Sequence, residues 1–81
     1  MWHIYILECK DKSLYVGVTT NLTERLDKHN KGKASKYTRG RTPVKMIFSE
    51  EHADKTSALK REHELKKWTR AKKLALVGKT Q

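Results

Sequence analysis

The sequence has few of the features that would place the chain outside the cytosol. Cys9 is the only cysteine among 81 residues, so no internal disulfide can form, and we expect no disulfide-linked partner either. No apolar run approaches the ~20 residues that span a bilayer. Residues 1–8 also lack the basic region and small-residue cleavage site of a signal peptide. We therefore expect a cytoplasmic protein without a membrane partner.

Acidic residues are scarce as well. Nine Asp and Glu residues stand against 19 Lys and Arg, which gives a formal net charge of +10. This excess favours a polyanionic partner, with nucleic acid first and an anionic membrane surface second, and a solvated basic surface is the alternative. A chain of this length buries only about 60% of its unfolded surface, so we expect one domain over residues 1–81. Its oligomeric state stays open.

Several motifs that define other enzymes are missing. The four histidines and Cys9 lack the ligand spacing of a structural zinc site. The sequence has no glycine-rich phosphate loop, no nucleophile elbow and no dinucleotide-binding fingerprint. Zinc modules, serine hydrolases of that type and dinucleotide-binding enzymes are therefore excluded.

Two apolar segments near the start of the chain predict a β-hairpin. Residues 2–9 and 14–20 are rich in β-branched and aromatic residues, and residues 10–12 form the loop between them. If Cys9 faces Ser13, then Tyr5 lies opposite Gly17, and Tyr15 projects from the same face of the sheet as Tyr5. Gly17 then leaves room for the Tyr5 ring. A slip of one residue would separate the two phenols.

A helix follows over residues 22–31, with Asn21 as its N-cap and Gly32 as its stop. At 100° per residue, one arc of roughly 100° holds Leu22, Arg25, Leu26 and His29. An arginine and a histidine therefore share the face that should pack against the sheet. Charged residues are rarely buried on a packing face, so Arg25 and His29 need a structural or functional reason to lie there.

Residues 32–43 form a basic loop, followed by a third strand over residues 44–49. The loop contains one aromatic residue among four cations, namely Tyr37 with Lys33, Lys36, Arg39 and Arg41. Basic residues interleaved with an aromatic residue suit phosphate contacts and base stacking on nucleic acid. The alternative is a loop that is merely soluble.

A second helix is expected over residues 55–67, capped by Asp54 or Thr56. Glu62 falls in the middle of its apolar face, which is otherwise formed by Ala58, Leu59 and Leu65. A buried carboxylate without a partner costs several kcal/mol, so Glu62 should pair with a cation or bind a metal. The alternative is a structural salt bridge to Arg25 or to a lysine.

A last helix is expected over residues 70–77, capped by Thr69 and closed by Gly78. The predicted order is β-β-α-β-α-α. This order describes an α+β domain in which helices flank a small three-stranded antiparallel sheet.

The residues in this order resemble the GIY-YIG nuclease domain over essentially the whole chain. The resemblance rests on an ordered set, Ile4-Tyr5, Tyr15-Val16-Gly17, Arg25, His29 and Glu62. The resemblance is closest to the small single-domain bacterial branch of the family. That branch is itself similar to the nuclease domain of the excision-repair endonuclease. His3 departs from the pattern, because the family usually has its first glycine there.

The resemblance implies a metal-dependent endonuclease that hydrolyses DNA phosphodiester bonds in repair, recombination or DNA processing. Glu62 would be the single protein ligand of Mg²⁺ or Mn²⁺, and Arg25 would donate to the phosphate oxygens. Tyr5, Tyr15 and His29 would surround the attacking water. Tyr15 and His29 both stay open as the general base, because a free phenol has a pKa near 10 and a free imidazole one near 6.5.

Competing functions remain at this stage. No appended DNA-binding module is present, so binding would fall to the basic loop, and Tyr37 within it favours single-stranded or branched DNA over duplex. The main alternative is a non-catalytic basic module that binds nucleic acid, which would leave Arg25, His29 and Glu62 unexplained. A third is a partner subunit in which Trp2 or Trp68 marks an interface.

Overall fold

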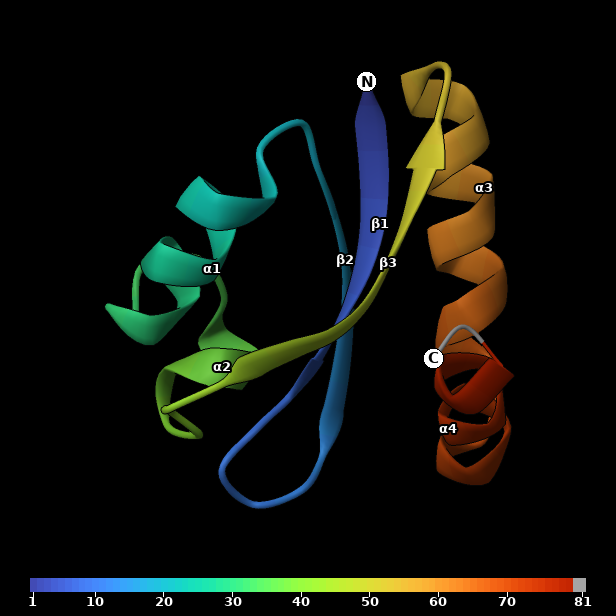
Figure 1. The fold of residues 1–81 in the computed structure, drawn as a ribbon. Coiled ribbons are helices and arrows are strands. Elements are labelled where there is room, and N and C mark those ends of the chain that lie inside the picture. The colour runs from blue at the N-terminus through green and yellow to red at the C-terminus, as the bar shows by residue number, and fades with distance from the viewer. Residues whose placement is uncertain (80–81) are drawn as a thin grey trace.

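The computed structural model describes residues 1–79 and shows a three-stranded antiparallel sheet between two pairs of helices (Figure 1). The sheet has the order β2-β1-β3, from strands β1 (Trp2–Glu8), β2 (Leu14–Thr19) and β3 (Lys45–His52). The helices are α1 (Leu22–Asn30), α2 (Lys36–Arg39), α3 (Lys55–Lys66) and α4 (Arg70–Lys79). The α+β class and the predicted order are confirmed, with α2 as an added short helix inside the expected loop.

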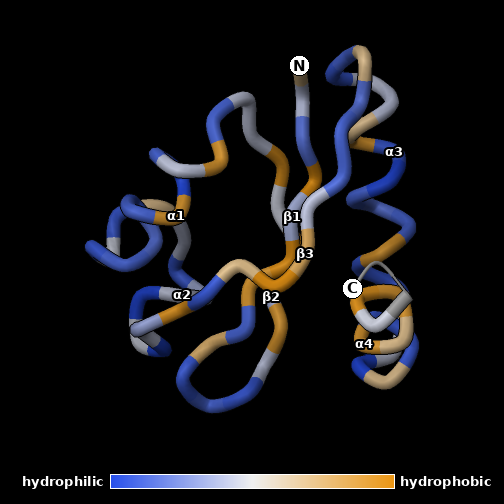
Figure 2. Tube along the Cα trace, in the orientation of Figure 1, coloured by the Kyte–Doolittle hydropathy of each residue, from blue (hydrophilic) through white to orange (hydrophobic). Residues whose placement is uncertain are grey.

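The two helix pairs cover opposite faces of the sheet (Figure 1). Because successive side chains of a strand point to opposite faces, Ile4 and Ile6 pack with Ala58 of α3 on one side. Tyr5 and Leu7 pack on the other side, in a cluster that extends to Leu22 and Leu26 of α1. The strands therefore separate two thin hydrophobic cores. Figure 2 shows that the middle of the strands is strongly apolar.

The hairpin adopts the register that brings the tyrosines to one face. Tyr5 pairs with Gly17 across β1 and β2, and the Cys9 amide donates to the Ser13 carbonyl at 2.9 Å. Lys12 occupies the position of the turn that usually takes glycine, with φ of 71°. The expected register is thus confirmed.

Helix α1 begins and ends close to the predicted residues. The Asn21 side chain accepts a hydrogen bond from the Glu24 amide at 3.0 Å, and Gly32 follows the helix with φ of +74°. The Asn30 side chain donates to the Val44 carbonyl at 3.1 Å and accepts from its amide at 2.7 Å. These two bonds fasten the end of α1 to the chain that enters β3.

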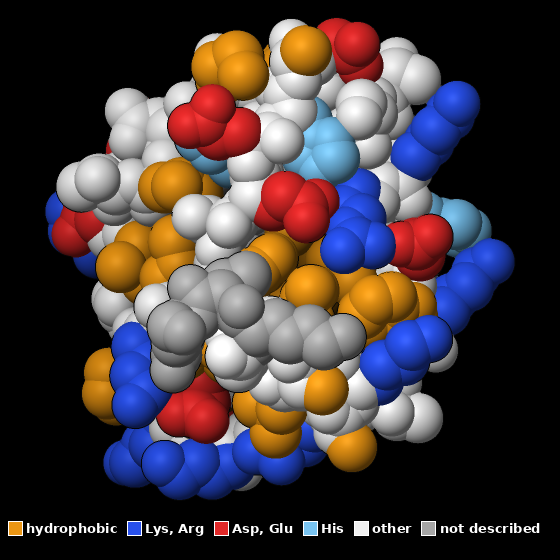
Figure 3. All heavy atoms as spheres, turned by 45° about the vertical axis from the view of Figure 1, so that its right-hand side comes forward, with side chains coloured by type: hydrophobic (Ala, Val, Ile, Leu, Met, Phe, Trp, Pro, Cys, Tyr) orange, Lys and Arg blue, Asp and Glu red, His pale blue; other side chains and the backbone are white. Residues whose placement is uncertain are grey.

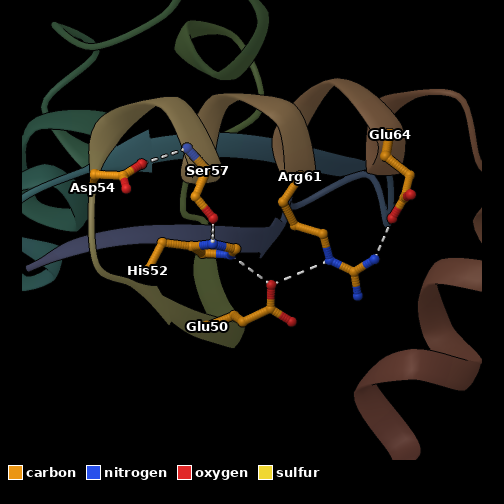
Figure 4. Close-up of polar contacts among 6 residues, drawn as sticks. All are labelled: Glu50, His52, Asp54, Ser57, Arg61 and Glu64. Carbon is orange, nitrogen blue, oxygen red and sulfur yellow. Dashed lines mark hydrogen bonds and ion pairs between the residues drawn. The ribbon is translucent and has the colours of Figure 1, made fainter.

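A polar network fixes the start of α3 against the end of β3 (Figure 4). Asp54 caps the helix by accepting from the Ser57 amide at 2.8 Å. Arg61 donates to Glu50 at 3.1 Å and also binds Glu64. The network as a whole consists of Glu50, His52, Asp54, Ser57, Arg61 and Glu64. It holds the rotation of α3, and thereby the direction in which Glu62 points.

Two expectations for the C-terminal half need correction. Leu59 is 42% exposed rather than part of the packing face, because Ala58 and Leu65 alone supply the buried contacts of α3. Gly78 lies inside α4 instead of closing it. Trp2 and Trp68 are partly buried against the core. No helix within residues 1–79 is long and apolar enough to cross a membrane.

Candidate active site

Two phenols and an imidazole form the centre of the site on the α1 side of the sheet. The Tyr5 hydroxyl lies 2.8 Å from Nε2 of His29, which is completely buried. The Tyr15 ring centroid is 5.2 Å from that of His29 and 6.5 Å from that of Tyr5. A Cβ at Gly17 would overlap the Tyr5 hydroxyl and ring. Only glycine therefore fits opposite Tyr5, as the sequence predicted.

The second nitrogen of His29 is also occupied. Its Nδ1 lies 2.8 Å from Oγ1 of Thr38, a residue of α2 that is itself completely buried. Both ring nitrogens are thus engaged inside the protein, and His29 faces no solvent in this arrangement. No sequence feature singled out Thr38, because a threonine within a basic loop carries no periodic or charge signal.

Burial, more than the neighbouring charges, keeps the two buried groups neutral. Burial, followed by the neighbouring Tyr15, raises the pKa of Tyr5 to about 12, while Arg25 opposes that rise and Glu62 adds to it. Burial and the positive charge of Arg25 lower the pKa of His29 below its usual value. At neutral pH the pair is therefore a phenol and an imidazole without charge. Arg25 and Glu62 both act on the Tyr5 hydroxyl from nearby.

Glu62 approaches the site from the far side of the sheet. Helix α3 covers the face opposite α1, and β2 is an edge strand, so the carboxylate reaches the site at the β2 edge. Its ion-pair partner is Lys66 at 3.6 Å, and Lys66 in turn lies over the Tyr15 ring at 5.9 Å from its centroid. Side chains of α1 and α3 thus converge on the Tyr5 hydroxyl although the two helices cover opposite faces of the sheet.

The five side chains proposed from the sequence thus gather around the Tyr5 hydroxyl. The model of the GIY-YIG catalytic domain family matches residues 1–75, a range that holds all five. The chain belongs to the GIY-YIG nuclease superfamily.

Other GIY-YIG proteins of similar size resemble this one along nearly its full length. A UPF0213 protein of Natronomonas pharaonis is 48% identical over 76 residues, which cover 94% of this chain and 89% of that protein. A UPF0213 protein of Clostridium perfringens is 51% identical, with coverage of 96% and 84%. The solution NMR structure of a UPF0213 protein from Bacillus halodurans shares 44% identity and a TM-score of 0.61, with coverage of 96% and 84%. The expected small branch is confirmed.

GIY-YIG nucleases generally depend on a divalent metal, and Glu62 fits that requirement as a single carboxylate ligand. Its side chain is 20% exposed, and its ion pair with Lys66 is long. Within residues 1–79 no group of three or more His, Cys, Asp or Glu side chains could hold a metal. A metal bound by Glu62 would therefore take its other ligands from water and substrate phosphate. Mg²⁺ accepts such a site, because it usually keeps several waters.

The basic segment divides into two parts in this GIY-YIG domain. Lys33, Lys36 and Arg39 line one hollow with Gly32, Ala34 and Ser35. Arg41 instead binds Asp11 at 2.9 Å and lies 4.2 Å above the Tyr37 ring. Tyr37 stacks on Tyr15 with 5.8 Å between ring centroids. Tyr37 and Arg41 are thus already engaged with the site, and base stacking on Tyr37 requires Arg41 to move.

Proposed function

We propose that this protein is a divalent-metal-dependent DNA endonuclease that hydrolyses phosphodiester bonds in the cytoplasm. The observation that carries the proposal is the convergence of five side chains of a GIY-YIG domain, Tyr5, Tyr15, Arg25, His29 and Glu62. The net charge of +10 suits a polyanionic substrate. Repair, recombination or DNA processing would call for such an activity.

Two charged residues would act on the scissile phosphate. Glu62 would hold Mg²⁺ or Mn²⁺, and that metal supplies Lewis-acid stabilisation of charge on the phosphate oxygens. Arg25 presents a guanidinium beside the buried Tyr5 hydroxyl, where it can donate to the same oxygens as their negative charge grows. The two groups approach from α1 and α3, on opposite faces of the sheet, so the phosphate would sit at the β2 edge.

We propose Tyr15 rather than His29 as the general base. His29 is completely buried and its two nitrogens are bound to Tyr5 and Thr38, so it has no free nitrogen for water. Tyr15 is partly exposed on the same face. We assign Tyr15 to the contact with the attacking water, and Tyr5 orients that water as a neutral phenol.

Substrate binding would rest on the cations around the hollow beside α2. Lys33, Lys36 and Arg39 present their charges toward a volume of about 230 Å³ that has room for a backbone phosphate. Contacts of this kind give affinity and salt dependence without sequence information. We therefore propose structure-selective cleavage of single-stranded or branched DNA.

Cleavage of labelled DNA tests the proposal. Single-stranded, duplex and forked substrates are incubated with Mg²⁺, Mn²⁺ or EDTA. We expect metal-dependent cuts that fall by at least about 100-fold in Glu62→Ala and in Arg25→Ala, since each removes charge stabilisation of the transition state. Glu51→Ala, which removes an exposed carboxylate on β3, and Lys28→Ala, which removes an exposed cation on α1, are matched controls that keep the activity.

The alternative function has a distinct outcome in the same assay. A protein that binds all three substrates but cuts none of them under any metal condition would be a non-catalytic nucleic-acid-binding module. If Glu62 were only a salt-bridge partner of Lys66, Glu62→Gln would lower the free energy of unfolding and leave the cuts intact.

A further inference from the structure

Helix α2 places one buried hydroxyl against His29, on the ring nitrogen that does not contact Tyr5. Thr38 is completely buried, and its Oγ1 lies 2.8 Å from Nδ1 of His29. The same oxygen lies 3.3 Å from the Ser35 carbonyl. Nε2 of His29 then contacts the Tyr5 hydroxyl at 2.8 Å. These contacts form one unbroken chain from the backbone of residue 35 to Tyr5.

The protons available to these hydrogen bonds indicate which atom of each pair is the donor. The imidazole is neutral, so one ring nitrogen carries a proton and the other accepts one. Arg25 beside Tyr5 can only donate, and among the described residues His29 is the one acceptor within hydrogen-bonding distance of the Tyr5 hydroxyl. Satisfying every buried donor within the protein therefore requires the Tyr5 proton to point to Nε2. The proton of His29 lies on Nδ1 and is donated to Thr38, whose own proton goes to the Ser35 carbonyl.

The opposite direction leaves a buried donor without a partner. If Thr38 donated to Nδ1, Nε2–H would donate to the Tyr5 oxygen, and the Tyr5 proton would then have no acceptor inside the protein. A buried polar group left unpaired in this way is costly, so the first direction is strongly preferred.

We propose that Thr38 is a positioning residue that, through the tautomer of His29, turns the Tyr5 proton inward and the Tyr5 lone pairs toward the reaction site. Tyr5 then faces the substrate as a hydrogen-bond acceptor. It can accept a bond from the attacking water or from Arg25, and it offers no proton that would compete for the water's lone pair. This role rests on the proposed nuclease function, but the tautomer itself does not.

NMR of ¹⁵N-labelled protein tests the tautomer without any substrate. Long-range ¹H–¹⁵N correlations distinguish a protonated Nδ1 from a protonated Nε2 in His29. We expect the Nδ1–H form in the native protein and in Thr38→Ser, which keeps the hydroxyl. In Thr38→Val, an isosteric change without the acceptor, the Nε2–H form should appear. Nε2–H in the native protein would overturn the proposal, whatever the variants do.

Steady-state cleavage gives the second readout. In Thr38→Val we expect kcat to fall by about 10- to 100-fold, the range seen when the partner that orients a functional histidine is removed. KM should stay within about twofold, because Thr38 touches no substrate and acts only through His29. Thr38→Ser should recover most of kcat. An unchanged kcat together with a retained Nδ1–H form in Thr38→Val contradicts the positioning role.

The two proposals fail in different ways. If the native protein cuts no DNA, the proposed function fails while the NMR measurement still decides the tautomer. If the native protein cuts DNA but His29 carries its proton on Nε2, the result supports the nuclease function and contradicts the proposed role of Thr38.

Discussion

The molecule contains two histidines that use both ring nitrogens, and their surroundings differ. His29 lies between two hydroxyls, those of Tyr5 and Thr38, and is completely buried. His52 lies between the Ser57 hydroxyl at 2.7 Å and the Glu50 carboxylate at 2.8 Å, and its side chain is 16% exposed (Figure 4). The buried histidine thus has only uncharged partners, whereas the outer one contacts an ion.

The difference follows from the cost of burying charge. A charged group away from water needs a well-placed counter-ion, and His29 has Arg25 nearby instead, which lowers its pKa further. On the α3 side, Lys and Arg side chains lie close to Asp and Glu side chains at the surface (Figure 3). Water and salt screen such pairs, so each contributes little. The buried hydrogen bonds of His29 should therefore contribute more to stability and activity than the exposed ones of His52.

Filling the space opposite Tyr5 should have the largest effect on activity, because it displaces the Tyr5 ring from its hydrogen bond to His29. The added Cβ in Gly17→Ala would overlap the Tyr5 hydroxyl, so the ring must leave its bond to His29. We expect a loss of about 1–3 kcal/mol in the free energy of unfolding from overpacking, together with loss of detectable cleavage. Urea unfolding and the DNA assay measure the two effects.

Gly78→Ala is the control for that change. A Cβ at Gly78 meets nothing within 4 Å inside α4, so the variant should gain roughly 0.5–1 kcal/mol of stability as a better helix former. Equal stability losses in both glycine variants would mean that the fit around Tyr5 is unimportant.

Truncating each histidine tests the comparison directly. His29→Ala leaves a cavity and a Tyr5 hydroxyl without its partner, so we expect a loss of about 2–4 kcal/mol. His52→Ala removes partners that water can replace, so its loss should stay below about 1 kcal/mol and shrink further at high salt. Urea unfolding of both variants at low and high salt is the measurement. Losses of similar size would remove the distinction between the two networks.

Acidification should give the smallest effect. Because the folded-state pKa of His29 lies below its ordinary value, the unfolded chain binds the proton more readily. This stabilisation is complete above about pH 6.5, the unfolded pKa, and is lost as the pH falls from there through the folded pKa. The urea midpoint should therefore decrease on acidification. His29→Gln should show a smaller decrease than His52→Gln, and the reverse order would contradict a neutral buried His29.

Some errors of the sequence analysis share one cause. Leu59 was expected on the packing face and is exposed, and Gly78 was expected to end a helix that continues through it. The loop over residues 32–43 was expected to be irregular and contains α2. In each case the local pattern was weak, so packing against the remainder of the chain decided the outcome.

The sequence by itself determined the features that depend on regular periods along one segment. Strand alternation and the length of the first loop set the Tyr5–Gly17 pairing, and the 3.6-residue helical period placed Arg25 and His29 on the inner face of α1. The same period singled out Glu62 on the second long helix, and the family resemblance added its role as a metal ligand.

Only the tertiary structure decided how separate segments meet. It placed α3 on the face opposite α1, so that Glu62 reaches the site around the β2 edge, and it brought Thr38 to His29 and Tyr37 to Tyr15. A lone hydroxyl in a short segment has no period, and the partner of Thr38 depends on how α2 packs against α1. For that reason the direction of the Tyr5 proton emerges only when the whole chain is folded.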